Sequence, residues 1–252
     1  MHRGKLIAGL ASAVVLAGAA PAAANVLPVG TWSFNETGGT VAHDTAFQPD
    51  NGTVQGGATF TKGRFWNALS FDGNASAVDI PERAIFDSPQ VTVSAWVNSA
   101  SSPGNFKYVV AKGASGCLAG SYGMYTGANG GLEFYVASND GLSFAISPDA
   151  GTGIWDGSWH SVVGTFNGSS VDLYVDGKEV GSGTPNTTPI DYGLPTSGDL
   201  MVGDYAGCSG LDFSGKIDEV HVFNRALPAQ EIRLGYFASG YLPQQFPDDA
   251  IL

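Results

Sequence analysis

Two tight turns in the second half of the chain place the strongest constraint on its fold. In "WHSVVGTFNGSSVDLYVDGKEVGSG", Asn167-Gly168 and Asp176-Gly177 each separate short runs rich in apolar and β-branched residues. Both dipeptides tolerate the positive φ angles that two-residue hairpin turns require. The segment therefore predicts three antiparallel strands that follow one another, at 160–166, 170–175 and 178–183.

The alternation of side chains within two strands predicts how the sheets are covered. In "SVDLYV" apolar residues alternate with Asp172 and Tyr174, the pattern of a sheet with one buried face. In "QVTVSAWV" the valines share one face and Trp96 lies on the other, so this strand should be covered on at least part of both faces. Two stacked sheets provide that environment.

Glycine and proline divide the rest of the chain into similar short runs. We expect further strands at 30–34, 67–73, 108–113, 122–126, 131–137, 142–147, 199–205 and 215–223, and one short helix at about 228–236. About a dozen strands and one helix predict an all-β fold, a two-sheet antiparallel jelly-roll sandwich. No linker-like run interrupts it, so we expect a single domain at 25–236, followed by a tail at 237–252.

The first 24 residues have the features of a secretory signal peptide. His2, Arg3 and Lys5 precede an apolar run that ends in Ala22-Ala23-Ala24, so cleavage is expected after Ala24. The run is interrupted by glycine and proline and is too short for a membrane span. We therefore expect a secreted, extracellular protein that does not insert into membranes.

Charge and cysteine content agree with that location. Loss of the leader removes two basic and no acidic residues, which changes the net charge from −12 to −14. Nucleic acid is a poor partner for such an acidic chain. Cys117 and Cys208 are the two cysteines, and both lie in glycine-rich loops. In an exported protein they predict one disulfide.

The order of motifs along the chain resembles a known family. The motifs include "WSFNETGGT", "VTVSAWV", "VVAKG", "YGMYT", "LEFYV", "LMVGDY" and "GKIDEVHVFNRALPAQEI". Together they resemble bacterial laminin-G-like domains of the concanavalin A-like lectin/glucanase superfamily, over residues 29 to about 234. The resemblance implies a concanavalin A-like jelly roll that serves as a carbohydrate-binding or adhesive module, often with a calcium ion. The same fold also carries glucanases and polysaccharide lyases, so fold alone does not decide function.

Asp218 and Glu219 are the first candidates for a catalytic pair. Adjacent residues of a strand point to opposite faces, so we expect Asp218 to share a face with Val220 and Glu219 to share one with His221. Such a pair could not flank one glycosidic bond. Motifs of zinc proteases and serine hydrolases are also missing from the sequence. We therefore predict a protein that is not an enzyme, with a divergent polysaccharide hydrolase or lyase as an alternative.

The loop "HDTAFQPDNGT" is rich in the oxygen ligands that calcium prefers. The resemblance implies that Asp218 lies beside this loop. We therefore predict a structural Ca²⁺ held by Asp44, Asn51 and Asp218 with backbone carbonyls. In the alternative, Asp218 and Asn51 only bond backbone amides.

The two cysteine loops offer aromatic and polar groups for a ligand. A Cys117–Cys208 disulfide would bring the loops together, and Tyr122, Tyr125, Asp204 and Tyr205 would form a rim that binds an extracellular glycan or polysaccharide. In the alternative, these tyrosines pack against the sheets. A protein-binding adhesion module that recognises a cell-surface protein through the same rim is the second functional hypothesis.

Overall fold

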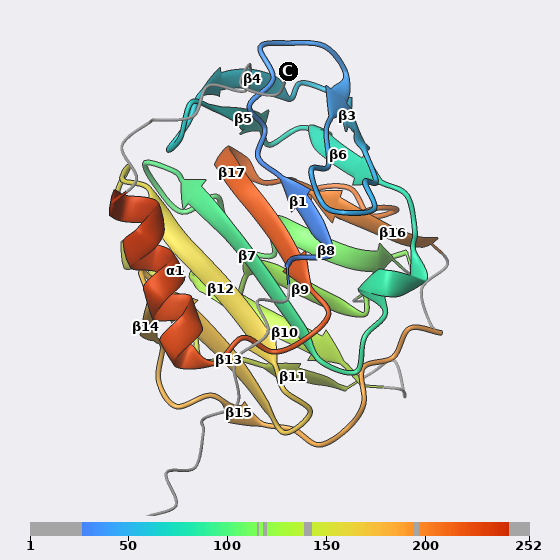
Figure 1. Cartoon of the computed structure of the whole chain (residues 1–252), viewed down its shortest axis with the longest axis vertical. Coiled ribbons are helices and arrows are strands. Elements are labelled where there is room, and N and C mark those ends of the chain that lie inside the picture. Colours follow the sequence, from blue (N-terminus) through green and yellow to red (C-terminus); the bar gives the residue numbers. More distant parts are fainter. Residues whose placement is uncertain (1–26, 115, 118–119, 139–142, 194–196, 242–252) are drawn as a thin grey trace, which may run out of the picture.

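The computed structural model describes residues 27–114, 116–117, 120–138, 143–193 and 197–241. The strands form two antiparallel sheets that face each other (Figure 1). The predicted signal peptide at 1–24 lies outside the described residues, as does the predicted tail from residue 242 onward.

The first sheet has the order β14-β13-β12-β7-β17-β5-β4, with β1 paired to β17 and β15 paired to β13. Its strands are β1 (Gly30–Trp32), β4 (Thr59–Lys62), β5 (Asn67–Asp72), β7 (Val91–Asn98), β12 (His160–Phe166), β13 (Ser170–Val175), β14 (Lys178–Glu179), β15 (Thr184–Pro185) and β17 (Ser214–Phe223).

The second sheet has the order β11-β10-β9-β8-β16-β6-β3-β2. Its strands are β2 (Val41–Ala42), β3 (Gly52–Gln55), β6 (Ala77–Ile80), β8 (Tyr108–Ala114), β9 (Tyr122–Thr126), β10 (Leu132–Ala137), β11 (Phe144–Ile146) and β16 (Ser197–Val202). Two 3-10 turns, η1 (Ala84–Phe86) and η2 (Thr152–Ile154), and the helix α1 (Ala229–Tyr241) complete the described structure. The predicted sandwich is confirmed.

The core lies between the sheets and consists of the side chains that point inward from the strands of both sheets. Phe134 of β10 is fully buried against Gly164 of β12, where a Cβ atom would collide with the Phe134 ring. Glycine at this position therefore lets the two sheets approach closely. Other fully buried members include Trp32, Leu69, Val93, Tyr122, Leu173, Ile217, Val220 and Val222.

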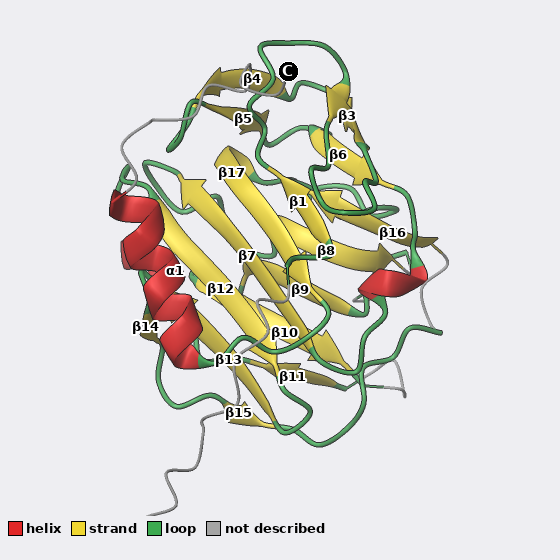
Figure 2. Ribbon diagram, in the orientation of Figure 1, coloured by secondary structure: helices red, strands yellow, loops and turns green. Residues whose placement is uncertain are grey.

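Helix α1 covers part of the outer face of the first sheet (Figure 2). Ile232 of α1 packs with Val163 of β12 and Tyr174 of β13. The expectation that "SVDLYV" has one buried face is therefore wrong, because the helix buries Tyr174 as well. The helix ends at Tyr241, beyond its predicted end. Among the described residues no helix is long and apolar enough to cross a membrane.

A β-bulge in β17 places both adjacent carboxylates on the outer face. Asp218 lies opposite Trp96, but His221 lies opposite Ser94, so three steps along β17 match two steps along β7. Glu219 adopts a φ of 50°, in the left-handed region that residues other than glycine rarely occupy. The prediction that Asp218 and Glu219 point to opposite faces is therefore wrong, because the extra residue shifts the alternation by one position.

Candidate functional site

The bulge of β17 forms one wall of a pocket on the outer face of the first sheet. The pocket has a volume of about 220 Å³ and lies between β7, β17, α1 and the turn that joins β4 to β5. In Figure 2, α1 lies to one side of β7 and β17 on this face. We call this cavity the bulge pocket; its lining includes Phe65, Ser94, Trp96, Glu219, His221 and Tyr236.

Glu219 and His221 are two of the partly exposed polar groups that line the bulge pocket; Glu231 of α1, which pairs with Arg225, is another. The side chains of Glu219 and His221 are 18% and 26% exposed. Ser33 Oγ donates to Glu219 Oε2 at 3.2 Å, and His221 Nδ1 lies 2.9 Å from the Glu219 carbonyl oxygen. A carbonyl only accepts, so Nδ1 carries the proton and Nε2 of the neutral ring is an acceptor.

Burial shifts both of these groups toward their neutral forms. It raises the pKa of Glu219 and lowers the pKa of His221, because a low-dielectric environment disfavours charge. The strained backbone of Glu219 and the perturbed pKa values are features that concentrate at functional sites.

Aromatic rings form the apolar side of the bulge pocket. The Trp96 ring is 6% exposed; Tyr236 stacks with it at a centroid distance of 5.9 Å, and Phe65 meets it edge-on at 5.9 Å. The Arg64 guanidinium lies 4.7 Å from the Trp96 ring centre. Trp96 therefore supports the half-buried rings of Phe65 and Tyr236, which line the cavity.

Asp218 holds the turn between β4 and β5 in place. It is fully buried, and its Oδ2 accepts hydrogen bonds from the backbone amides of Arg64 at 2.8 Å and Phe65 at 3.1 Å. Its Oδ1 has no hydrogen-bond partner among the described residues. Burial raises the pKa of Asp218 to about 8, and the neighbouring Glu219 carboxylate adds to this rise. Asp218 is a positioning residue for Phe65.

Two of the three predicted calcium ligands, Asp44 and Asn51, contact each other. Asp44 accepts hydrogen bonds from the amides of Thr31, Ala46 and Asp50, and its own amide donates to Asn51 Oδ1. Asp44 and Asn51 thus lie together. Asn51 and Asp218 each accept from backbone amides, which agrees with the alternative prediction for these two residues.

Strand β1 separates Asp44 from β17. Trp32 pairs with Val220 on one edge and with Asp44 on the other. Two strand spacings put the backbone of Asp44 about 10 Å from β17. The backbone of Asp44 thus lies two strands away from that of β17, which carries Asp218. No group of three or more His, Cys, Asp or Glu side chains in the described part of the chain is arranged to hold a metal ion. Calcium binding by the loop of Asp44 and Asn51 stays a prediction.

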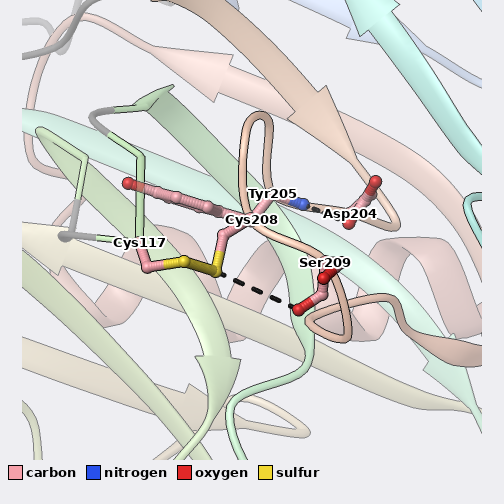
Figure 3. Close-up of a disulfide and its surroundings, with 5 residues drawn as sticks. All are labelled: Cys117, Asp204, Tyr205, Cys208 and Ser209. Carbon is pink, nitrogen blue, oxygen red and sulfur yellow. Dashed lines mark hydrogen bonds between the residues drawn. A yellow bond between two sulfur atoms is a disulfide. The ribbon is translucent and has the colours of Figure 1, made fainter.

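The predicted disulfide is confirmed. Cys117 and Cys208 are joined, with their Cα atoms 4.9 Å apart, so the loop after β8 is tied to the loop after β16. Figure 3 shows the Tyr205 ring beside the disulfide and Asp204 on the other side of its loop. Burial raises the pKa of Asp204 to about 6. Asp204 and Tyr205 therefore do not face a common patch.

The predicted tyrosines pack with other side chains of the protein. Tyr205 is 1% exposed and its ring centre is 4.6 Å from that of Tyr108, which also stacks with Tyr125 at 5.4 Å. Tyr122 is fully buried in the core between the sheets, and its hydroxyl lies 3.4 Å from the Phe86 carbonyl oxygen. The structure thus brings Tyr125 and Tyr205 into one packed cluster and places Tyr122 elsewhere.

A laminin-G profile, described as the concanavalin A-like lectin/glucanases superfamily, matches residues 72–233. No curated protein sequence matches the chain.

Solved structures share the fold. Domain 4 of AbnA, an extracellular arabinanase from Geobacillus stearothermophilus, in complex with arabinotriose, is 18% identical, with a TM-score of 0.61 over 82% of this chain and 97% of that one. A structure of botulinum neurotoxin type C, whose cell entry depends on two ganglioside molecules, is 13% identical, with a TM-score of 0.63 over 85% of this chain and 52% of that one. The binding domain of botulinum neurotoxin DC with rat synaptotagmin II is 13% identical, with a TM-score of 0.62 over the same shares.

These identities show the fold alone, and this chain spans about half the length of the toxin chains. The neighbours include binding domains and a domain of an enzyme, so they do not decide whether the chain has an activity. The profile match covers more than half of the sequence and agrees with the two-sheet sandwich. The chain belongs to the concanavalin A-like lectin/glucanase superfamily.

Proposed function

We propose that the protein is a secreted, non-catalytic carbohydrate-binding protein and that an extracellular glycan binds in the bulge pocket. One observation carries the proposal: the pocket combines half-buried aromatic rings with Glu219 and His221 on the rigid outer face of a sheet. Aromatic surfaces suit the C–H faces of sugars, and a few placed polar groups fix orientation. Export rests on the predicted signal peptide.

The structural neighbours support a carbohydrate ligand. One was solved with arabinotriose, and another depends on gangliosides for cell entry. Their low identity does not transfer a particular sugar to this chain. The proposal for this chain therefore stands on its own pocket.

The burial of Asp218 supports a non-catalytic role. Glycosidases place the scissile bond between two carboxyl groups. Glu219 and Asp218 do share a face, but Asp218 is fully buried and bonded to the amides of Arg64 and Phe65. Glu219 is therefore the partly exposed member of this pair, and Glu231, the other carboxylate that lines the pocket, is bonded through both oxygens to Arg225. Release of reducing ends from a polysaccharide would instead support the hydrolase alternative.

The variant Glu219→Gln is expected to weaken glycan binding by about tenfold or more. A hydrogen bond from a sugar hydroxyl to a carboxylate is worth roughly 1.5 to 3 kcal/mol, and glutamine keeps the shape but removes the charge. Isothermal titration with arabino-, xylo-, cello- and malto-oligosaccharides measures the change.

Glu179→Gln is the matched control, because Glu179 is exposed on β14 in the same sheet and does not line the bulge pocket. The control should bind as the wild type does. Equal affinity of wild type and Glu219→Gln for a sugar that binds would contradict the assignment of the pocket.

A protein partner at the same face is the second candidate. The neurotoxin DC binding domain, which shares the fold, was solved in complex with synaptotagmin II. A pull-down from cell-surface proteins that persists in excess free sugar, and that Glu219→Gln weakens, would favour this function over glycan binding.

Calcium is the third part of the proposal. Backbone carbonyls of the loop would add to Asp44 and Asn51 to supply the six to eight oxygens that Ca²⁺ takes. Adding calcium to metal-stripped protein is expected to raise the melting temperature, since a ligand of the native state stabilises it. The same addition should have a smaller effect on Asp44→Asn. A melting temperature that excess calcium leaves unchanged in the wild type would show that the loop binds no calcium.

A further inference from the structure

A second pocket adjoins the bulge pocket. It has a volume of about 520 Å³, and its lining includes Ser33, Asn35, Glu36, His43, Thr45 and Trp66. We call it the Trp66 pocket. Pockets for small-molecule ligands commonly measure 300–1,000 Å³, so the bulge pocket alone, at about 220 Å³, is small.

One hydrogen bond and one pair of consecutive residues link the two pockets. Ser33 lines the Trp66 pocket, and its hydroxyl donates to Glu219 Oε2 in the bulge pocket at 3.2 Å. Phe65 and Trp66 are consecutive residues of the turn between β4 and β5, and each lines one pocket. A ligand that leaves the bulge pocket past Glu219 therefore meets the Trp66 pocket.

The turn between the pockets is held from both sides. Asp218 binds the amides of Arg64 and Phe65, and the side-chain amide of Asn67 donates to the carbonyl oxygens of Asn35 at 3.2 Å and Glu36 at 3.1 Å. Trp66 is held at a φ of 41°, and its side chain remains 47% exposed. An aromatic ring that is fixed and exposed beside polar groups is a stacking surface for a sugar.

The charges in the Trp66 pocket favour a neutral ligand. Glu36 Oε1 accepts from the His43 amide at 2.6 Å and lies 2.9 Å from His43 Nδ1, while Glu36 Oε2 is buried and finds no partner within the described structure. A sugar carboxylate in the groove would meet like charge at Glu36 and at Glu219, whereas a neutral sugar would not. Arg64, the guanidinium near the bulge pocket, lies over the rings of Phe65 and Trp96.

We propose that the two pockets form one groove for a neutral oligosaccharide, in which Trp66 stacks with one sugar unit while Glu219 binds another unit. This inference rests on the proposed function, because it assumes that a glycan occupies the bulge pocket. The groove further specifies that the ligand is uncharged and long enough to fill both pockets. Affinity should rise with chain length until both pockets are filled.

The test is titration with cello-, malto-, xylo- and arabino-oligosaccharides of two to six units, and with sialyllactose as the acidic probe. In the series that binds, the longer members should bind at least about tenfold tighter than the shortest. Trp66→Ala should remove this gain and leave binding of the shortest member unchanged, and Trp66→Phe should keep part of it. Phe47→Ala is the control, because Phe47 is 91% exposed and lines neither pocket.

The outcomes separate the two proposals. Affinity that does not depend on length, or that Trp66→Ala leaves unchanged, overturns the groove, while Glu219→Gln still tests the bulge pocket. Tighter binding of sialyllactose than of every neutral chain overturns the neutral ligand. If none of these sugars binds, the groove and the proposed function both fail.

Discussion

The variant Asp218→Asn is expected to be more stable than the wild type at pH 8 and about equally stable at pH 4. Burial raises the pKa of Asp218 to about 8, whereas an unfolded aspartate ionises near pH 4. Between these values the native state holds one proton more than the unfolded state. This carboxyl therefore lowers the free energy of unfolding by about 1 kcal/mol for each pH unit of increase.

Asparagine does not titrate, and its side-chain oxygen can still accept from the amides of Arg64 and Phe65. Urea unfolding of both proteins at pH 4, 5, 6, 7 and 8 measures the effect. Other groups with shifted pKa values, such as Asp204, titrate in both proteins, so the difference between the two curves reports Asp218 together with its effect on the neighbouring Glu219.

Asp218→Ala is the companion variant. It leaves both amides without their acceptor, so it should be less stable than Asp218→Asn at every pH, by about 1 to 3 kcal/mol for each amide that water does not reach. Parallel curves for the wild type and Asp218→Asn from pH 4 to 8 would contradict the protonated state of Asp218 in the folded protein.

Removal of the Cys117–Cys208 disulfide is the second large effect. The bond closes a loop with a sequence separation of 91 residues. In the chain-entropy view, opening such a loop costs roughly 4 to 5 kcal/mol of stability, because the unfolded chain gains freedom. Unfolding of the double variant Cys117→Ser/Cys208→Ser, compared with the wild type in oxidising buffer, measures this loss.

Sugar affinity is the control for the disulfide variant. The disulfide and its tyrosine cluster border the second sheet, whereas the bulge pocket lies on the outer face of the first. Below its melting temperature the double variant should therefore bind sugars as the wild type does. Loss of binding with the fold intact would indicate that the ligand contacts the cysteine loops.

Most strands could be predicted because their signals are local. Asn167-Gly168 and Asp176-Gly177 do separate β12, β13 and β14, and both glycines have positive φ. The face that Trp96 occupies was also predictable, because β7 keeps a strict period of two. Cover by α1 could not be predicted, since it depends on a contact between Tyr174 and a residue distant in sequence, Ile232.

The spacing of apolar residues in β17 indicates the bulge, but this signal is missed when a regular strand is assumed. The core residues of "KIDEVHVF" are Ile217, Val220 and Val222, at spacings of three and two. A spacing of three within an alternating strand indicates one extra residue, and a bulge that carries Glu219 supplies it. The bulge pocket itself joins Phe65, Glu219 and Tyr236 from three separate segments, so no local motif could have identified it.

The predicted tyrosine rim shows why aromatic residues in glycine-rich loops are ambiguous. The sequence pattern around Tyr125 and Tyr205 is compatible with a ligand site and also with packing against a sheet. In the structure both rings pack beside Tyr108 and are at most 7% exposed. Trp66, by contrast, lies in the turn between β4 and β5 with a positive φ and is 47% exposed.

A crystal structure soaked with the oligosaccharide that binds tightest tests the central claim most directly. The account predicts that a sugar unit lies in the bulge pocket, within hydrogen-bond distance of Glu219 and in contact with Phe65 and Tyr236. A sugar bound at the tyrosine cluster beside the disulfide, with the bulge pocket free of it, would contradict the claim.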